Sequence, residues 1–387
     1  MIKCGEGYTV NGELICDKDY ESKAEARVYD SRYSILMDIG HEYCNMCCRY
    51  CCCHPKPKET NLKDYFKIDK EKMINLIKES DTKRYNKPVK KHAFEIWGGE
   101  PLFNFDAFVE TYDTLKEAFP ESRFWTSTNG ILLKDDKICE ILIANNIGLQ
   151  LSHDGLGQHL RGIDPLKDEH TLENVKALID TGILSTVNCT LSQVNPSWFD
   201  NIDYWTETLG ADLVDRLNIK LNHPYDSDYN FEFAFTDEEI TKRYLNEFTT
   251  LYWKCYNDPK AFKAFRYYIL EQGNRYSICK PENNTSACRA YQSWKYDIPG
   301  NYKSDSTFVI MTTGEYGECN LAPKVDNPGG VQPDYCKDCK YKDCKECQHC
   351  GAMNYPKVCR YQKLWMETIE NIWRTKKCLE HSALQKN

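Results

Sequence analysis

The sequence contains neither a long apolar run nor a concentration of basic residues. No stretch approaches the about 18 consecutive apolar residues of a membrane-spanning helix. The opening residues, MIKCGEGYTV, lack the apolar segment of a secretory leader. The formal net charge is -8, without a basic block. We therefore expect a cytoplasmic protein with no membrane partner and no nucleic-acid partner, because anionic membranes and nucleic acids both attract clustered positive charge.

Cysteine is the residue that the sequence has in excess, with 21 among 387 residues. Six of them fall within ten positions, between residues 44 and 53. The odd count, the clustering and the missing leader favour metal binding in a reducing compartment over a disulfide scaffold. Adjacent cysteines such as Cys47 and Cys48 also suit disulfides poorly.

The densest segment is HEYCNMCCRYCCCH, residues 41–54. Cys44, Cys48 and Cys51 stand in it at C-x3-C-x2-C spacing, with the aromatic Tyr50 before the last cysteine. Thiolates so close on one loop can share one soft metal centre without a long loop closure. A structural metal site generally takes four protein ligands, whereas three leave a position open for a substrate. We therefore favour an iron–sulfur cluster over a zinc finger, whose ligands pair as C-x2-C, and over disulfides.

This spacing resembles the signature of the radical S-adenosylmethionine (S-adenosyl-L-methionine, SAM) enzymes. The resemblance implies that Cys44, Cys48 and Cys51 are the catalytic cysteines, which hold a [4Fe–4S] cluster, and that the methionine end of SAM occupies the fourth iron. It also implies reductive cleavage of SAM, with an electron from a flavodoxin or ferredoxin, to a 5′-deoxyadenosyl radical that abstracts hydrogen from a substrate. Four residues are surplus to the motif, and either pack the loop or supply a redox or substrate-binding thiol: Cys47, Cys52, Cys53 and His54.

From residue 33 onward, apolar runs alternate with helical patterns. Strands are predicted at six ranges: 34–39, 93–97, 124–127, 148–152, 185–190 and 217–221. Helices are predicted between them at 71–78, 105–118, 136–145, 171–180 and 196–209. Such alternation predicts a parallel sheet with right-handed crossovers. Six units are too few for a closed eight-stranded barrel, so we predict an α/β fold, a partial (β/α)6 TIM-like barrel, followed by a cysteine-rich C-terminal cluster-binding domain.

Two motifs follow successive predicted strands, at the edge where parallel α/β folds carry their chemistry. Strand 93–97 runs into Gly98-Gly99-Glu100-Pro101, whose glycines let the backbone approach a ligand and whose carboxylate can accept from an ammonium group. It resembles the GGE motif of the family, which cradles the amino group of SAM. Strand 124–127 ends in Ser127-Thr128-Asn129-Gly130, a turn by composition. This turn resembles the Ser/Thr-Asn-Gly segment that lies beside the cofactor in the family. The resemblance implies cofactor contacts for Ser127 and Asn129.

Strand 148–152 ends in Ser152-His153-Asp154-Gly155, and Arg161 follows. Relatives commonly carry Ser-Leu-Asp-Gly here, which implies that Ser152 and Asp154 lie near the ribose and that Arg161 reaches the cofactor carboxylate. His153 departs from that pattern. Inside the barrel it would exchange protons near neutral pH, and facing a helix it would be a hydrogen-bonded structural residue.

Polar residues inside the later strands are also candidates for the cofactor pocket, because burying them unpaired is expensive. We expect a cofactor contact from Asn188, with Thr190 beside it, and a substrate contact or simple turn chemistry from His223. Tyr50, within the cysteine motif, completes the predicted cofactor-binding residues.

Cysteine becomes dense again beyond residue 278, with lysines and aspartates between. The C-x2-C pairs there would also suit zinc ribbons. The order G-x4-C, C-x2-C, a further pair and a last cysteine before a helix at 362–373 resembles the SPASM extension of the family, which implies one or two auxiliary [4Fe–4S] clusters. Carried over by position, the nearer cluster would be held by Cys279, Cys288, Cys319 and Cys350. The outer cluster would be held by Cys336, Cys339, Cys359 and either Cys344 or Cys347.

Four domains are predicted from these patterns. They are an N-terminal hairpin preface at 1–33, a radical SAM partial barrel at 34–235, a helical linker at 236–278 and a SPASM-like auxiliary cluster domain at 279–387. Because SPASM relatives act largely on peptides or proteins, we expect crosslinking (thioether or carbon–carbon) or oxidation of a peptide or protein side chain. The alternatives are radical modification of a small metabolite or nucleotide, and a non-enzymatic electron carrier or zinc-binding module.

Overall fold

The computed structural model describes residues 8–10, 13–15, 31–37, 44–51, 66–85, 89–222, 233–274, 307–314 and 356–384. A seven-stranded parallel sheet dominates them, in the order β8-β7-β6-β5-β4-β3-β9. Its edges β8 and β9 do not pair, so the sheet is a partial barrel that stays open. The strands are β3 (Ser31–Leu36), β4 (His92–Trp97), β5 (Arg123–Thr128), β6 (Gly148–Ser152), β7 (Leu184–Thr190), β8 (Asn218–Asn222) and β9 (Thr307–Met311).

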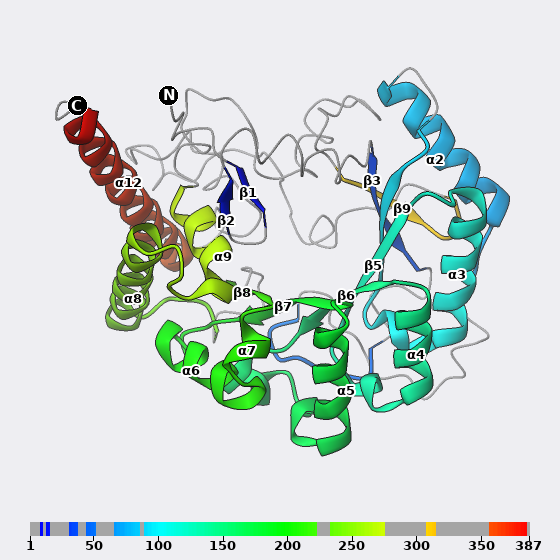
Figure 1. The fold of residues 1–387 in the computed structure, drawn as a ribbon, viewed down its shortest axis with the longest axis horizontal. Helices are drawn as coiled ribbons and strands as arrows, with labels where there is room; N and C mark the ends of the chain where they lie inside the picture. The colour runs from blue at the N-terminus through cyan, green and yellow to red at the C-terminus, as the bar shows by residue number, and fades with distance from the viewer. Residues whose placement is uncertain are drawn as a thin grey trace.

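Helices cover the outer side of the curved sheet, as Figure 1 shows. They are α2 (Lys70–Tyr85), α3 (Phe105–Ala118), α4 (Asp136–Ala144), α5 (Glu169–Asp180), α6 (Trp198–Leu209) and the short α7 (Ala211–Val214). Their starts are set locally, because capping side chains accept hydrogen bonds from free backbone N–H groups of the first turn. Asn104, Asp135, Asp168 and Ser197 cap α3, α4, α5 and α6 in this way.

The two faces of the sheet differ in polarity. In β6, Leu149 and Leu151 are buried, whereas the alternating residues Gly148, Gln150 and Ser152 are half-buried. β8 repeats the pattern, with apolar residues buried and Asn218, Lys220 and Asn222 half-buried on the inner face. The apolar face packs on the helices, and the polar face lines the inside of the open barrel. A closed TIM barrel instead fills its interior with branched apolar side chains.

Two further helices and the chain end pack beside β8. α8 (Glu238–Asn257) and α9 (Lys263–Asn274) lie in the range predicted as a helical linker. The long α12 (Pro356–Leu384) packs on both, with the rings of Trp365 and Phe248 4.8 Å apart. Tyr361 stacks on Phe235 at 5.2 Å. The carboxyl-terminal helix therefore shares a core with the barrel.

The six predicted strands are confirmed, with ends that differ by a few residues. The hairpin of β1 (Tyr8–Val10) and β2 (Glu13–Ile15) is also present. β9 and α7 were not predicted. β9 follows the first of the C-terminal cysteines in sequence, yet it pairs in parallel with β3 and buries Ile310 completely. The four predicted domain ranges stay predictions.

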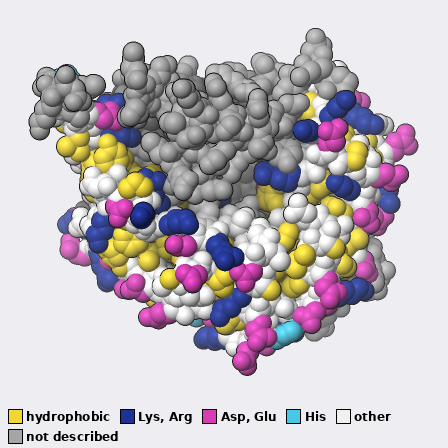
Figure 2. Space-filling model, in the orientation of Figure 1, with side chains coloured by type: hydrophobic (Ala, Val, Ile, Leu, Met, Phe, Trp, Pro, Cys, Tyr) yellow, Lys and Arg dark blue, Asp and Glu magenta, His cyan; other side chains and the backbone are white. Residues whose placement is uncertain are grey.

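The described surface carries charges of both signs. On the face drawn in Figure 2, acidic and basic side chains are interspersed over the described residues. None of the helices in the described ranges combines the length and the apolar character of a membrane-spanning segment.

Candidate functional site

The predicted motifs meet at the carboxyl edge of the sheet, around the described cluster-loop residues 44–51. The backbone N–H of Arg49 donates to the Leu160 carbonyl at 2.9 Å. Asn129, in the turn after β5, donates from Nδ2 to Oδ1 of Asn45 at 2.7 Å. The segments that follow β5 and β6 therefore hold the loop at two points along its length.

The three motif cysteines are half-buried free thiols, whereas Cys47 is exposed. The backbone N–H of Met46 donates to Sγ of Cys44 at 3.4 Å, and Asn129 Nδ2 lies 3.7 Å from the same sulfur. A hydrogen bond from the Cys51 N–H to the Cys48 carbonyl, 3.0 Å long, closes a tight turn between the other two cysteines.

The surroundings of these thiols fit an iron–sulfur cluster. Burial raises the pKa of Cys44 to about 12 and that of Cys48 to about 11, against which the nearby Arg161 guanidinium lowers the Cys48 value. Metal-free thiols in such surroundings stay protonated, and metal binding displaces the protons. N–H donors and a guanidinium beside sulfur are groups that stabilise an anionic cluster. Among the described residues no three His, Cys, Asp or Glu side chains could hold one metal ion, but each cysteine of a [4Fe–4S] cluster binds a different iron.

Glu100 joins the GGEP motif to the end of β5. Its carboxylate accepts from Thr128 Oγ1 at 2.9 Å, from the Asn129 N–H at 2.7 Å and from the Leu102 N–H at 3.2 Å. The last contact caps the short 3-10 helix η2 (Pro101–Asn104). Burial raises the pKa of Glu100 to about 7, although these hydrogen bonds favour the ionised form. A carboxylate has about four acceptor positions, so one remains for an ammonium group.

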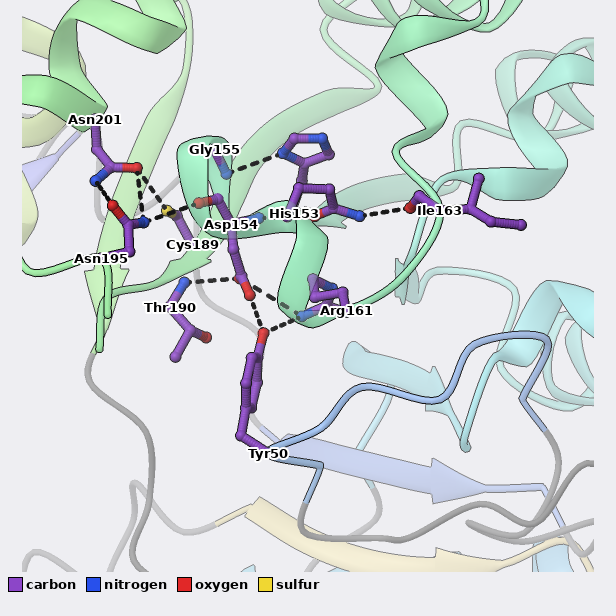
Figure 3. Close-up of polar contacts among 11 residues, drawn as sticks. Tyr50, His153, Asp154, Gly155, Arg161, Ile163, Cys189, Thr190, Asn195 and Asn201 are labelled. Carbon is purple, nitrogen blue, oxygen red and sulfur yellow. Dashed lines mark hydrogen bonds and ion pairs between the residues drawn. The ribbon is translucent and has the colours of Figure 1, made fainter. Parts of the chain in front are cut away.

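A second network surrounds Asp154, at the end of β6 (Figure 3). The carboxylate is fully buried and accepts from the Tyr50 hydroxyl and, at 2.9 Å, from the Thr190 N–H. Arg161 Nη1 donates to the Tyr50 hydroxyl at 3.0 Å and lies 3.6 Å from Asp154 Oδ1. Burial raises the pKa of Tyr50 well above its ordinary value, so the phenol is neutral. Asn195 Nδ2 donates to the Asp154 carbonyl at 3.5 Å and holds this strand end from the β7 side.

His153 does not point into the barrel. Its Nδ1 accepts from the Gly155 N–H at 3.1 Å, and its Nε2 lies 2.9 Å from Asp164 Oδ1. The ring is fully buried between Tyr204 and Trp205. Because Nδ1 accepts, the proton of a neutral ring is on Nε2, directed at Asp164. The structural alternative for His153 is therefore confirmed.

The remaining predicted residues lie around the same edge. Ser127, Ser152, Gly98 and Gly99 are half-buried, and Pro101 is buried. Asn188 is half-buried and donates to Gln150 Oε1 at 3.1 Å on the inner face. Phe233 also belongs to this site and was not predicted: its ring meets Tyr50 edge-on at 6.1 Å and lies 5.1 Å from the Arg49 guanidinium. No local sequence signal marks Phe233, because it comes from beyond β8.

Several predicted residues lie outside the described part of the chain. They are Cys52, Cys53, His54, His223 and the auxiliary-cluster cysteines Cys279, Cys288, Cys319, Cys336, Cys339, Cys344, Cys347 and Cys350. Cys359 falls within the first turn of α12. The auxiliary clusters therefore stay a prediction.

Fold and site together define a class. Residues 39–203, somewhat less than half of the chain, match the model of the Radical SAM superfamily, which supports a radical SAM domain in this part of the chain. Among curated proteins, the chain is similar to the radical SAM cyclopropyl synthase TigE of Paramaledivibacter caminithermalis, with 26% identity over 244 residues. That alignment covers 58% of this chain and 50% of TigE, so the chain spans about half the length of this relative.

Among solved structures, the fold resembles that of anSMEcpe. Native anSMEcpe with bound AdoMet aligns with a TM-score of 0.58 and 17% identity, over 90% of this chain and 100% of that chain. The form with bound AdoMet and the Cp18Cys peptide aligns with a TM-score of 0.57 and 15% identity, over 90% and 99% of the two chains. At these identities the likeness shows the fold alone.

Proposed function

We propose that this chain is a radical SAM enzyme that cleaves SAM reductively and uses the resulting 5′-deoxyadenosyl radical to modify a peptide or protein side chain. The observation that carries the proposal is the network through Asn129. Its side chain contacts the cluster loop at Asn45 and Cys44, and its backbone N–H donates to Glu100. One residue thus connects the predicted cluster site with the predicted site for the SAM ammonium group.

Each motif has a separate part in this proposal. Cys44, Cys48 and Cys51 would hold the cluster, which when bound supplies the electron that breaks a carbon–sulfur bond of SAM. Glu100, with the open backbone of Gly98 and Gly99, would accept from the SAM ammonium group. The Arg161 guanidinium would bind the carboxylate, because its Nε is buried and has no hydrogen-bond partner among the described residues. Ser152 and Asn188, half-buried on the inner face, would line the ribose side.

The polar inner face of the sheet supports a substrate inside the open barrel. Glu95, Gln150 and Lys220 lie on that face, two of them charged and all half-buried. Burial raises the pKa of Glu95 and lowers that of Lys220, so both charges lack full solvation and a polar ligand would favour them. A peptide is proposed because anSMEcpe, whose fold is similar, has been solved with the Cp18Cys peptide. The predicted auxiliary clusters would bind substrate or accept the electron of the product radical.

The test is anaerobic reconstitution with iron and sulfide, followed by dithionite and SAM. We expect release of 5′-deoxyadenosine and methionine. Cys48→Ala is expected to abolish this release. Cys47→Ala, which alters the exposed neighbouring thiol, serves as the matched control and is expected to keep it. An iron-containing wild-type protein that releases no 5′-deoxyadenosine would instead support an electron carrier, and a zinc-containing protein would support a binding module.

A further inference from the structure

We propose that Tyr50 is a positioning residue for SAM. Its hydroxyl, held between Asp154 and Arg161, fixes the cluster loop against the ends of β6 and β7 and orients the Arg161 guanidinium toward the cofactor carboxylate. Asp154 acts through this contact and not as a free carboxylate for the ribose. This inference rests on the proposed function, since it names how SAM is held.

The first argument is that the protein itself already uses both oxygens of Asp154. Oδ2 accepts from the Tyr50 hydroxyl, and Oδ1 accepts from the Thr190 N–H at 2.9 Å. Arg161 Nη1 lies 3.6 Å from Oδ1, and the carboxylate has no exposed surface. These three donors leave about one acceptor position for a ribose hydroxyl, on a carboxylate that has no exposed surface. Buried groups that have found charge-assisted partners give them up at considerable cost.

The second argument concerns the direction of the hydrogen bonds at Tyr50. A guanidinium only donates and an ionised carboxylate only accepts. The tyrosine hydroxyl therefore accepts from Arg161 at 3.0 Å and donates to Asp154. Phenylalanine has a ring of the same size but no hydroxyl, so it can neither donate nor accept a hydrogen bond at this position. In a buried site each of these bonds polarises the other, so the hydroxyl links the two charges through one short chain.

The third argument is the position of this link in the fold. Tyr50 belongs to the cluster loop, Asp154 and Arg161 flank the 3-10 helix η4 (Gly155–Leu160), and Thr190 ends β7 (Figure 3). The hydroxyl is thus the point where the cysteine motif meets two strand ends. The phenol contacts Nη1 of Arg161, whereas Nε of Arg161 has no partner among the described residues. A cofactor carboxylate would supply that partner.

The loop does not depend on Tyr50 alone. The Arg49 N–H bond to Leu160 and the Asn129 bond to Asn45 are independent of the phenol. Tyr50→Phe should therefore still assemble its cluster while losing the orientation of Arg161. The chain also offers a matched control, because the Tyr33 hydroxyl donates to buried Asp81 Oδ1 at 2.7 Å on the helix-covered face of the sheet. Tyr33→Phe removes the same kind of bond away from the site.

The experiment measures SAM binding to reconstituted, oxygen-free protein, by equilibrium dialysis and by the change that SAM causes in the EPR spectrum of the reduced cluster. For Tyr50→Phe we expect wild-type iron and sulfide content and a dissociation constant raised about tenfold, since hydrogen bonds to charged groups have effects of this order. For Tyr33→Phe we expect a lowered Tm and an unchanged dissociation constant. Asp154→Asn should weaken binding as well, and the double variant should lose less than the sum of the two single effects, because both changes disturb the Tyr50–Asp154 contact.

Two results would overturn the inference. If Tyr50→Phe lowers Tm but binds SAM like the wild type, the phenol is merely structural. If the effects of Tyr50→Phe and Asp154→Asn simply add, Asp154 contacts the cofactor independently. Failure of the reconstituted wild-type protein to bind SAM would contradict the proposed function, and this inference with it. The wild-type measurement alone distinguishes that outcome from the two results above, in which the wild-type protein binds SAM.

Discussion

The backbone N–H of Asn129 donates a 2.7 Å hydrogen bond to Oε2 of Glu100. Asn129 directly follows β5 and Glu100 lies three residues after β4, its neighbour in the sheet, so the bond links the two motifs beside the cluster loop. The Asn129 side chain extends the connection to Cys44 and Asn45. A substitution of the Asn129 side chain therefore changes the contacts with the cluster loop and keeps the backbone hydrogen bond to Glu100.

Asn129→Ala is expected to make the reduction potential of the cluster more negative. The substitution removes the Nδ2 donor near Cys44 but keeps the backbone bond to Glu100. Hydrogen-bond donors to cluster sulfur stabilise the reduced cluster, which carries the more negative charge. Loss of one such hydrogen bond, with a free energy of about 1 kcal/mol, should therefore lower the one-electron reduction potential by about 40 mV. An EPR-monitored redox titration without SAM measures this. Asn145→Ala, which removes an exposed helix-end bond, should leave the potential unchanged, and a shift of equal size there would contradict the prediction.

SAM binding should weaken as the pH falls below 7. Burial raises the pKa of Glu100 from 4.5 to about 7, and only the ionised carboxylate pairs with the ammonium group. The fraction of ionised Glu100, and with it the affinity, should fall up to about tenfold per pH unit below that value. Glu100→Gln should bind SAM more weakly and lose this pH dependence between pH 5 and 7. A variant that keeps the wild-type pH profile would assign the dependence to another group.

His153 should affect stability and not proton transfer. His153→Phe retains the ring between Tyr204 and Trp205 but removes the partners of Asp164 and of the Gly155 N–H. We expect a loss of about 2 kcal/mol in the free energy of unfolding and an unchanged shape of the pH profile for 5′-deoxyadenosine release. Chemical denaturation and rate measurements between pH 6 and 9 test this. His170→Ala, at an exposed ion pair with Asp136, is the control and should stay within about 0.5 kcal/mol.

The unpredicted strand β9 should contribute to barrel stability. Ile310 is fully buried beside β3, so Ile310→Ala should cost about 2–5 kcal/mol in the free energy of unfolding. Ile163→Ala changes an isoleucine that is 66% exposed and should have little effect. Thermal denaturation of both variants decides the matter. Equal stability of the two would show that residues 307–311 do not belong to the barrel core.

The sequence by itself determined the class of chemistry and the order of the elements. Three cysteines at fixed spacing with Tyr50, and strands that alternate with helices, are local patterns, and local patterns encode periodicity and turn chemistry directly. The GGEP, STNG and SHDG motifs could be placed at one edge of the sheet for the same reason, because the carboxyl ends of parallel strands share an edge.

Only the tertiary structure decided which side chains meet. Tyr50 and Asp154 are 104 positions apart, and their contact depends on the curvature of the sheet and the path of η4. The orientation of His153 toward Asp164, away from the barrel, and the pairing of β9 with β3 are of the same kind. Such contacts follow from register and packing across the whole fold. A short stretch of sequence carries no record of them, because one residue of offset or a small change in twist directs a side chain to the other face.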